Sequence, residues 1–395
     1  MKVSISRWGG ISKSFHRGGF PAVSRPIAGC FIETILYNRR CGRFSGDPRA
    51  GTRRPGGDAM SSFAIGVDLG GTNLRVAAID DSGSTLEIIS TLANIGRGRE
   101  RVIEEIAAAT LGLAGKFRGS HRLLGIGVGI PGIIDLASGT VCSAANLPGW
   151  TDYPVRKHLE AKLGAAVILE NDANCAALGE KWVGAGRHAD DLCMLTLGTG
   201  VGGAFVFHGL PWHGTIGMAG ELGHLTVFPE GRACACGNRG CLEQYASATA
   251  IQNAALEAIA GGRAANLRRA QKPGERISAR AVFQCALEGD PVARRIFDDA
   301  GRALGIVLAN LINALNLSVY VVGGGLSQAW QIFSPALFQE LRQRSIVFCA
   351  SEAAVAGRPR TLVTPALLRE NSGLIGAARL PMIMAAPRDA RPLAV

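Results

Sequence analysis

The sequence of 395 residues lacks any apolar run approaching the roughly 20 residues that a transmembrane helix requires. It is also poor in charge, since Asp, Glu, Lys and Arg make up 18% of the residues while hydrophobic types make up 47%. A chain of this composition and length is expected to be globular rather than disordered, with room for two domains. These shortages argue against a membrane protein and against a disordered one.

Most of the net charge of +11 lies in one segment, because residues 1–59 hold eleven Lys and Arg against three acidic residues. That segment carries +8 and shows no sustained helical or strand periodicity, whereas regular patterning begins directly after Met60. We interpret it as an extension upstream of a true start at Met60; a transit peptide and a basic nucleic-acid arm are the alternatives. The remaining chain is nearly neutral, and we therefore expect no nucleic-acid partner.

A strand, a glycine turn and a second strand follow one another twice, which suggests two related halves. "FAIGV" (63–67) and "LRVAAID" (74–80) enclose the first turn, and "LCMLTL" (192–197) and "AFVF" (204–207) enclose the second. No helix follows either turn, so neither is a dinucleotide-binding motif. Either turn alone can be an ordinary β-turn, but two N–H clamps from two lobes can hold the phosphates of one nucleotide.

Asp68 ends the first strand and Thr72 follows the first glycine turn, so both would face a phosphate-bound Mg²⁺. A third glycine cluster follows the strand "SVYVV" (318–322) and precedes an expected helix. It suits a nucleoside or ribose against bare backbone, or a connection that simply needs positive φ.

The polar trio of residues 170–172 lies between a buried strand and a helix in "AAVILENDANCAALGEKW" (165–182). Asp172 is expected at the C-terminal end of the strand, where α/β folds place ligands. Asn171 or Asp172 can act as a helix cap, but capping needs only one of them. A sugar hydroxyl that attacks phosphorus needs a carboxylate to accept its proton, and Asp172 is the candidate.

Three of the ten cysteines lie within "CACGNRGC" (234–241). A disulfide between Cys234 and Cys236 would be strained, a thioredoxin-type Cys-x-x-Cys is absent, and most other cysteines stand singly in apolar surroundings. That usage is typical of a reducing compartment, and we expect a cytoplasmic protein. The remaining set, with His224, Cys234, Cys236 and Cys241, suits a closed tetrahedral Zn²⁺ site, which would be structural because no coordination position stays open.

A zinc ion that holds His224 would also fix Glu221 before it and Glu243 after it. These carboxylates and the imidazole edge would form a rigid wall of acceptors for sugar hydroxyls. Such a wall discriminates between epimers, because a wrong epimer leaves a buried partner unpaired.

Four motifs in this order, "DLGGTNLR", "LGTGVGG", "AGELGH" and "CACGNRGCLE", resemble the ROK family (repressors, open reading frames, kinases), most of all its bacterial glucokinases. The resemblance spans about residues 62 to 380. It implies an α/β, actin-like, hexokinase-type (ribonuclease H-like) fold with a structural zinc site, in which two lobes close over ATP and sugar. Residues 60–173 with 372–385 would form the small lobe, and 174–371 the large one.

The resemblance also implies roles for individual residues. Asp172 matches the general base, and the sugar-binding set comprises Asn146, Asn171, Asp172, Glu221, His224 and Glu243. The nucleotide-binding set comprises Asp68, Gly70, Gly71, Thr72, Asn73, Gly198, Thr199, Gly200, Gly323, Gly324 and Gly325. The zinc ligands are His224, Cys234, Cys236 and Cys241.

The implied activity is the Mg²⁺- and ATP-dependent phosphorylation of the 6-hydroxyl of glucose by a homodimer. A kinase for N-acetylglucosamine or N-acetylmannosamine is one alternative, since only the pocket near the second sugar carbon would differ. A sugar-responsive regulator is another, but residues 1–59 show no two patterned helices of a DNA-binding domain. Fructokinases of the family tend to have Pro in place of the Ala-Gly-Glu found here, which argues against fructose.

Overall fold

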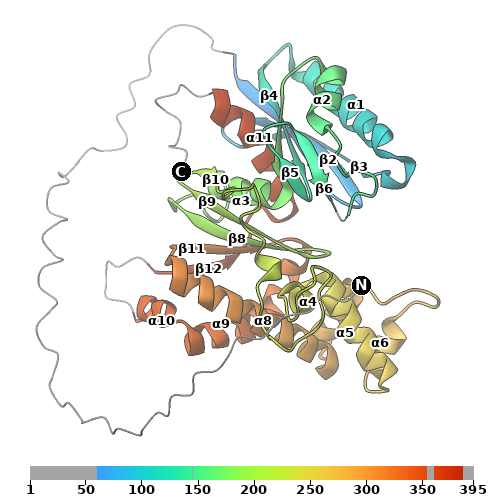
Figure 1. Ribbon diagram of the computed structural model, residues 1–395, viewed down its shortest axis with the longest axis vertical. Coiled ribbons are helices and arrows are strands. Elements are labelled where there is room, and N and C mark those ends of the chain that lie inside the picture. The colour runs from blue at the N-terminus through green and yellow to red at the C-terminus, as the bar shows by residue number, and fades with distance from the viewer. Residues whose placement is uncertain (1–59, 145, 354–359, 386–395) are drawn as a thin grey trace, which may run out of the picture. The chain divides into compact units, whose positions relative to one another are not determined.

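The computed structural model describes residues 60–144, 146–353 and 360–385. The basic segment 1–59, interpreted above as an extension, lies outside the described residues. Two five-stranded sheets organise the described chain, with helices on both faces of each (Figure 1). No helix of this part of the chain is long and apolar enough to cross a bilayer.

The first sheet has the strand order β3-β2-β1-β4-β7. Its antiparallel strands are β1 (Ser62–Leu69), β2 (Asn73–Asp80) and β3 (Thr85–Leu92), and β4 (Arg122–Ile130) and β7 (Val167–Asn171) continue it in parallel. Helices α1 (Arg99–Phe117) and α2 (Val155–Leu163) pack on one face. Phe63, Ile65 and Val67 of β1 face them, because alternate side chains of a strand point to the same side.

The second sheet has the order β10-β9-β8-β11-β12 and repeats the strand directions of the first. Its strands are β8 (Leu192–Leu197), β9 (Val201–Phe207), β10 (Leu210–Pro211), β11 (Val319–Gly323) and β12 (Leu362–Pro365). In each sheet an antiparallel group of three strands is extended by two parallel ones. This shared topology confirms the sequence prediction of two related halves.

A layer of helices covers the outer face of the second sheet (Figure 1). They are α4 (Glu243–Ala246), α5 (Ala248–Ala260), α6 (Ala265–Ala270), α7 (Ala279–Leu287), α8 (Pro291–Leu315), α9 (Trp330–Arg344) and α10 (Ile346–Glu352). Phe297, Leu304 and Phe333 of these helices pack with Tyr320 of β11 in one buried core. Burial of such large side chains stabilises this half by about 1.5–3 kcal/mol each.

Two helices lie between the sheets: α3 (Asp172–Trp182) packs on β8 and β9, and α11 (Ser372–Ala385) packs on β1 and β4 (Figure 1). The pair approach closely because glycines face the partner helix. A Cβ atom on Gly376 would lie 1.7 Å from the carbonyl oxygen of Cys175, and one on Gly179 would lie 2.2 Å from that of Ser372. Through α11 the chain returns to the first sheet, with which residues 372–385 were grouped in the sequence analysis.

Glu180, near the end of α3, is fully buried and joins α3 to the chain that enters α11. Its carboxylate accepts hydrogen bonds from the backbone N–H groups of Leu367 (3.1 Å) and Leu368 (2.8 Å) and from the hydroxyl of Ser372 (2.7 Å). A buried carboxylate with such a set of donors specifies one arrangement of the segments that it connects.

Short elements complete the described chain. They are the hairpin of β5 (Ile133–Asp135) and β6 (Thr140–Ser143) and the 3₁₀ helices η1 (Ile95–Arg97), η2 (Leu222–His224), η3 (Gly325–Ala329) and η4 (Arg369–Asn371).

Candidate active site

A cavity of about 780 Å³ collects residues from both halves of the fold. Volumes of this size are typical of small-molecule sites. The predicted site residues that line it are Gly70, Gly71, Asn146, Asn171, Asp172, Gly198, Thr199, Gly200, Glu221, His224, Cys236, Glu243 and Gly324. Asp68, Thr72, Asn73, Gly323 and Gly325 are not among the lining residues.

Asn171 and Asp172 occupy the junction of β7 and α3, as the sequence predicts. The side chain of Asn171 caps α3, because its oxygen accepts from the backbone N–H groups of Ala173 (2.9 Å) and Asn174 (3.2 Å). Its amide nitrogen donates to the carbonyl of Gly132 at 3.2 Å. Capping therefore accounts for Asn171, and Asp172 does not need that role.

Asp172 makes one side-chain hydrogen bond among the described residues, from the N–H of Ala173 to Oδ1 at 2.9 Å. Burial raises the pKa of this carboxyl group above its ordinary value, and the charge of Glu221 raises it further. The bond from Ala173 acts in the opposite direction. A half-buried carboxylate with raised proton affinity in a cavity is suited to accept a proton from a bound hydroxyl.

Asp68, at the end of β1, is a second carboxyl group with perturbed titration. Burial and the nearby charge of Asp172 raise its pKa to about 6, although Arg75, its cross-strand partner, opposes the shift. The carboxylate lies against Gly373 at the start of α11, where an added Cβ atom would be 3.4 Å away. Asp68 thus does not line the cavity, although the charge of Asp172 raises its pKa.

The first glycine turn closes a hairpin, with a 2.8 Å bond from the N–H of Gly70 to the carbonyl of Asn73. In the second turn the N–H of Gly198 donates to Gly200 at 2.9 Å. Both turns therefore join antiparallel strands, as predicted. At the third cluster, Gly324 has φ +80°, and a Cβ atom there would lie 2.4 Å from the carbonyl oxygen of Leu197. The third cluster thus also fits its alternative interpretation, a strand-to-helix connection that requires positive φ.

The predicted metal ligands form a compact group, with all four ligand atoms within 4.8 Å of one another. Sγ of Cys234 is 3.7 Å from Nδ1 of His224, and Sγ of Cys236 is 3.7 Å from Sγ of Cys241. Tetrahedral zinc with Zn–S bonds of about 2.3 Å and Zn–N bonds of about 2.0 Å requires ligand separations of roughly 3.6–3.8 Å. The residues present therefore fit such an ion.

Surrounding groups support the same cluster. Gly237 and Gly240, which lie between the cysteines, have φ values of +92° and +72°, a conformation that glycine adopts readily in tight turns. Side-chain amides donate to two of the sulfur atoms, from Asn238 to Cys241 at 3.4 Å and from Gln244 to Cys234 at 3.5 Å. Such donors favour thiolates, the form that binds a metal.

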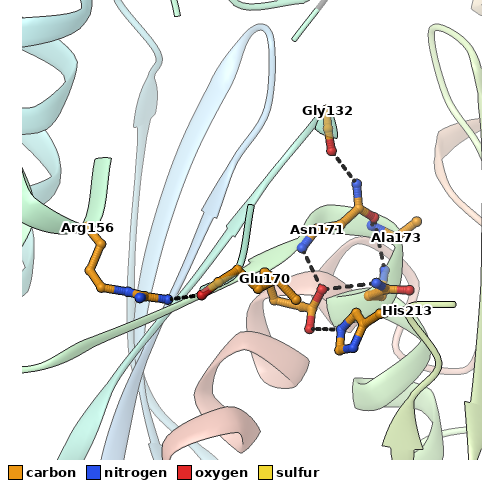
Figure 2. Close-up of polar contacts among 8 residues, drawn as sticks. Gly132, Arg156, Glu170, Asn171, Ala173 and His213 are labelled. Carbon is orange, nitrogen blue, oxygen red and sulfur yellow. Dashed lines mark hydrogen bonds and ion pairs between the residues drawn. The ribbon is translucent and has the colours of Figure 1, made fainter. Parts of the chain in front are cut away.

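Glu170 and His213 form a contact at the cavity that the sequence analysis did not assign. Oε2 of Glu170 lies 2.7 Å from Nε2 of His213, and the two side chains face each other in Figure 2. This bond raises the pKa of His213, while burial acts against it. The only sequence signal was that Glu170 extends a buried strand, because its partner lies 43 residues away.

Comparison with known proteins places the chain in a family. Residues 64–382 match the ROK family model. The chain is 38% identical to a glucokinase of Halalkalibacterium halodurans over 80% of this chain and 94% of that enzyme. A ROK family glucokinase of Streptomyces griseus, solved with glucose and AMPPNP, is 33% identical with a TM-score of 0.68, covering 81% of this chain and 99% of that one.

Relatives with other functions are also present. An N-acetyl-D-glucosamine kinase of Vibrio cholerae is 34% identical over 66% of this chain and 84% of that enzyme. A xylose repressor of Caldicellulosiruptor bescii is 31% identical over 72% of this chain and 71% of that protein. The described fold is the actin-like, hexokinase-type fold of the ROK sugar kinases. Because the family model covers most of its length, the chain belongs to the ROK family.

Proposed function

We propose that the chain is an ATP-dependent hexokinase that transfers the γ-phosphoryl group of ATP to the 6-hydroxyl of glucose. The observation that carries the proposal is the position of Asp172 in a cavity lined by glycine turns from both sheets. A carboxylate in that position can accept the hydroxyl proton while backbone N–H groups bind the phosphates. The similarity to glucokinases supports glucose as the sugar.

In this mechanism Asp172 is the general base and takes the proton of the attacking hydroxyl. We assign the phosphates to the turns at residues 70–73 and 198–200 and the adenosine to residues 323–325. Phosphoryl transfer needs little covalent help from the protein, so most of the rate enhancement would come from positioning and charge stabilisation. Exclusion of water from the closed cavity would suppress hydrolysis of ATP.

Mg²⁺ bound to the ATP phosphates would neutralise the charge that develops during transfer. Asp68 is the residue that we assign to the surroundings of this ion. Burial and the nearby charge of Asp172 raise the pKa of Asp68, and a cation would favour the ionised form of both carboxyl groups. The negative charge of Asp68 would favour binding of the cation, and Asp68 would not contact the sugar.

We assign structural zinc to the Cys₃His cluster and the sugar to the cavity wall beside it. Nδ1 of His224 faces the sulfur of Cys234, whereas its Nε2 lies 4.0 Å from the carboxylate of Glu221. A metal on Nδ1 would place the ring proton on Nε2, toward the cavity, as a donor. Asn146, Asn171, Glu221 and Glu243 would supply the other sugar contacts.

A coupled ADP-release assay with Mg·ATP tests the reaction and the substrate together. Glucose, mannose, fructose, N-acetylglucosamine and N-acetylmannosamine would be compared at equal concentration, and we expect glucose to have the highest kcat/KM. Preference for an N-acetyl sugar would keep the mechanism and replace the substrate, as the relative from Vibrio cholerae suggests. Absence of turnover on all five, with salt-dependent binding to operator DNA, would instead favour a regulator, as the xylose repressor relative suggests.

A further inference from the structure

The carboxylate of Glu170 connects two segments of the cavity wall. It is only 4% exposed, and a buried carboxylate must be matched by donors. Oε1 accepts from the N–H of Asn171 and from the side-chain amide of Asn174, both at 2.9 Å, so this oxygen is satisfied within its own junction. Oε2 instead accepts from His213, which belongs to a different segment (Figure 2).

His213 begins the loop 213–221 that leads from β10 to Glu221. The N–H of Ala219 donates back to the carbonyl of His213 at 3.1 Å, which closes the loop on its first residue. Gly214, Gly217 and Gly220 all have positive φ values, from +66° to +97°. Glycines of this kind leave the loop few side chains with which to hold its shape.

The tip of the loop has no apolar anchor either. Ile216 is 75% exposed and Met218 is 36% exposed, so neither is buried in a core. The loop nevertheless lines the cavity from Gly217 to Glu221. Backbone packing at Gly220 holds the loop at one end, and the His213–Glu170 bond holds it at the other. Between them, an added Cβ atom on Gly217 would lie 3.6 Å from the carbonyl oxygen of Ile134.

We propose that His213 is a positioning residue: its bond to Glu170 holds the loop that carries Glu221 against the junction that carries Asn171 and Asp172. The inference rests on the proposed function, since Glu221 and Asp172 are there the sugar-binding group and the base. His213 itself does not line the cavity, so it acts through the loop rather than on the sugar.

The chemistry of the pair fits this role. Glu170 raises the pKa of His213, so the bond gains ionic character and becomes stronger than a neutral hydrogen bond. Loss of His213 would leave Oε2 buried without a donor and free the first residue of the loop. Since displacements of about 1 Å can cost about 100-fold in an active site, sugar affinity should be sensitive to this bond.

Three variants of the full chain test the proposal. His213→Ala removes the donor, His213→Gln keeps an N–H donor at similar reach, and His188→Ala removes an exposed histidine outside the cavity as a control. For His213→Ala we expect a rise of about 10-fold or more in the KM for glucose with the KM for ATP nearly unchanged, and a Tm only a few degrees lower because Oε2 of Glu170 loses its donor. His213→Gln should restore most of the glucose affinity.

Amide hydrogen exchange gives a readout that does not depend on activity. Exchange of the backbone N–H groups of residues 214–221 should be at least about 10-fold faster in His213→Ala than in the unmodified chain, His213→Gln or His188→Ala. Unchanged exchange in His213→Ala would overturn the proposal, as would an equal rise in the KM values for glucose and ATP. If the unmodified chain phosphorylates no sugar, the proposed function fails while the exchange result still decides whether His213 holds the loop.

Discussion

The carboxylate of Glu243 accepts a hydrogen bond from the backbone N–H of Val201 at 2.9 Å. A residue two positions after the last cysteine of the Cys₃His cluster thus supports the second glycine turn, 42 residues away in sequence. The contact is close, because a Cβ atom on Gly200 would lie 2.3 Å from Oε2 of Glu243. Through this residue the Cys₃His cluster, the cavity wall and the second glycine turn form one connected structure.

Substitution of Glu243 should therefore affect both substrates. Glu243→Ala leaves the N–H of Val201 without its acceptor and should raise the KM for ATP as well as that for glucose, each by about 5- to 10-fold, a loss of roughly 1 kcal/mol per bond. Glu243→Gln keeps an oxygen for Val201 and should spare the KM for ATP while the KM for glucose stays high. Steady-state kinetics with Glu257→Gln, an exposed glutamate on α5, as control would show this pattern; an unchanged KM for ATP in Glu243→Ala would contradict it.

Removal of the metal should loosen the sugar wall. We expect about one zinc ion per chain by elemental analysis, and its loss in Cys241→Ser, because Cys241 is fully buried in the ligand cluster. That variant should show a lower Tm and a higher KM for glucose, since His224 and Glu221 lose their support. Cys142→Ser is the matched control, because Cys142 lies outside the cluster; equal zinc content in both variants would refute the assignment.

The pH dependence of turnover should reflect the ionisation of Asp172. Asp172 must be ionised to accept a proton, and its pKa lies above the ordinary value because of burial and Glu221. Activity should therefore fall as the pH drops through this raised pKa, at a higher pH than for an ordinary Asp near 3.9. Glu221→Gln removes one cause of the shift and should move the acidic limb of kcat to lower pH; a limb that does not move would contradict the electrostatic account.

The packing of α3 against α11 predicts a strong effect on stability. Gly376→Ala places a methyl group 1.7 Å from the carbonyl oxygen of Cys175 and should lower the free energy of unfolding by about 3 kcal/mol or more, as a severe overpacking. Gly112→Ala is the opposite case, since this exposed position in α1 has no atom within 4 Å of an added Cβ atom. It should stabilise by about 0.5–1 kcal/mol. Denaturant unfolding of both variants would measure the contrast, and a mild effect of Gly376→Ala would show that the helices can separate at little cost.

Local patterns in the sequence predicted much of this arrangement. The strand–glycine turn–strand units, the junction of Asn171 and Asp172 and the Cys₃His set all rest on residues close in sequence, where spacing restricts geometry strongly. The bonds of Glu170 with His213 and of Glu243 with Val201 join residues 43 and 42 positions apart. Nothing local marks His213, because a single histidine beside an apolar segment has no preferred partner until the chain has folded.

The roles of Asn171 and Gly324 show a second limit of sequence reasoning. Both were predicted as binding residues, and both also meet a local structural need, as a helix cap and as a left-handed connection. One residue can serve both purposes, so pattern alone does not separate them. Substitution with kinetic readout is what distinguishes a ligand contact from a cap.

Asp172→Asn tests most directly whether Asp172 is the base for phosphoryl transfer to a sugar. The asparagine is nearly isosteric but cannot accept the proton, so kcat in the glucose-dependent ADP-release assay should fall by about 100- to 10,000-fold. Glucose binding, measured by calorimetry on the same preparation, should change far less, and the Tm should be close to that of the unmodified chain. Normal turnover in a folded, glucose-binding Asp172→Asn variant would contradict the account.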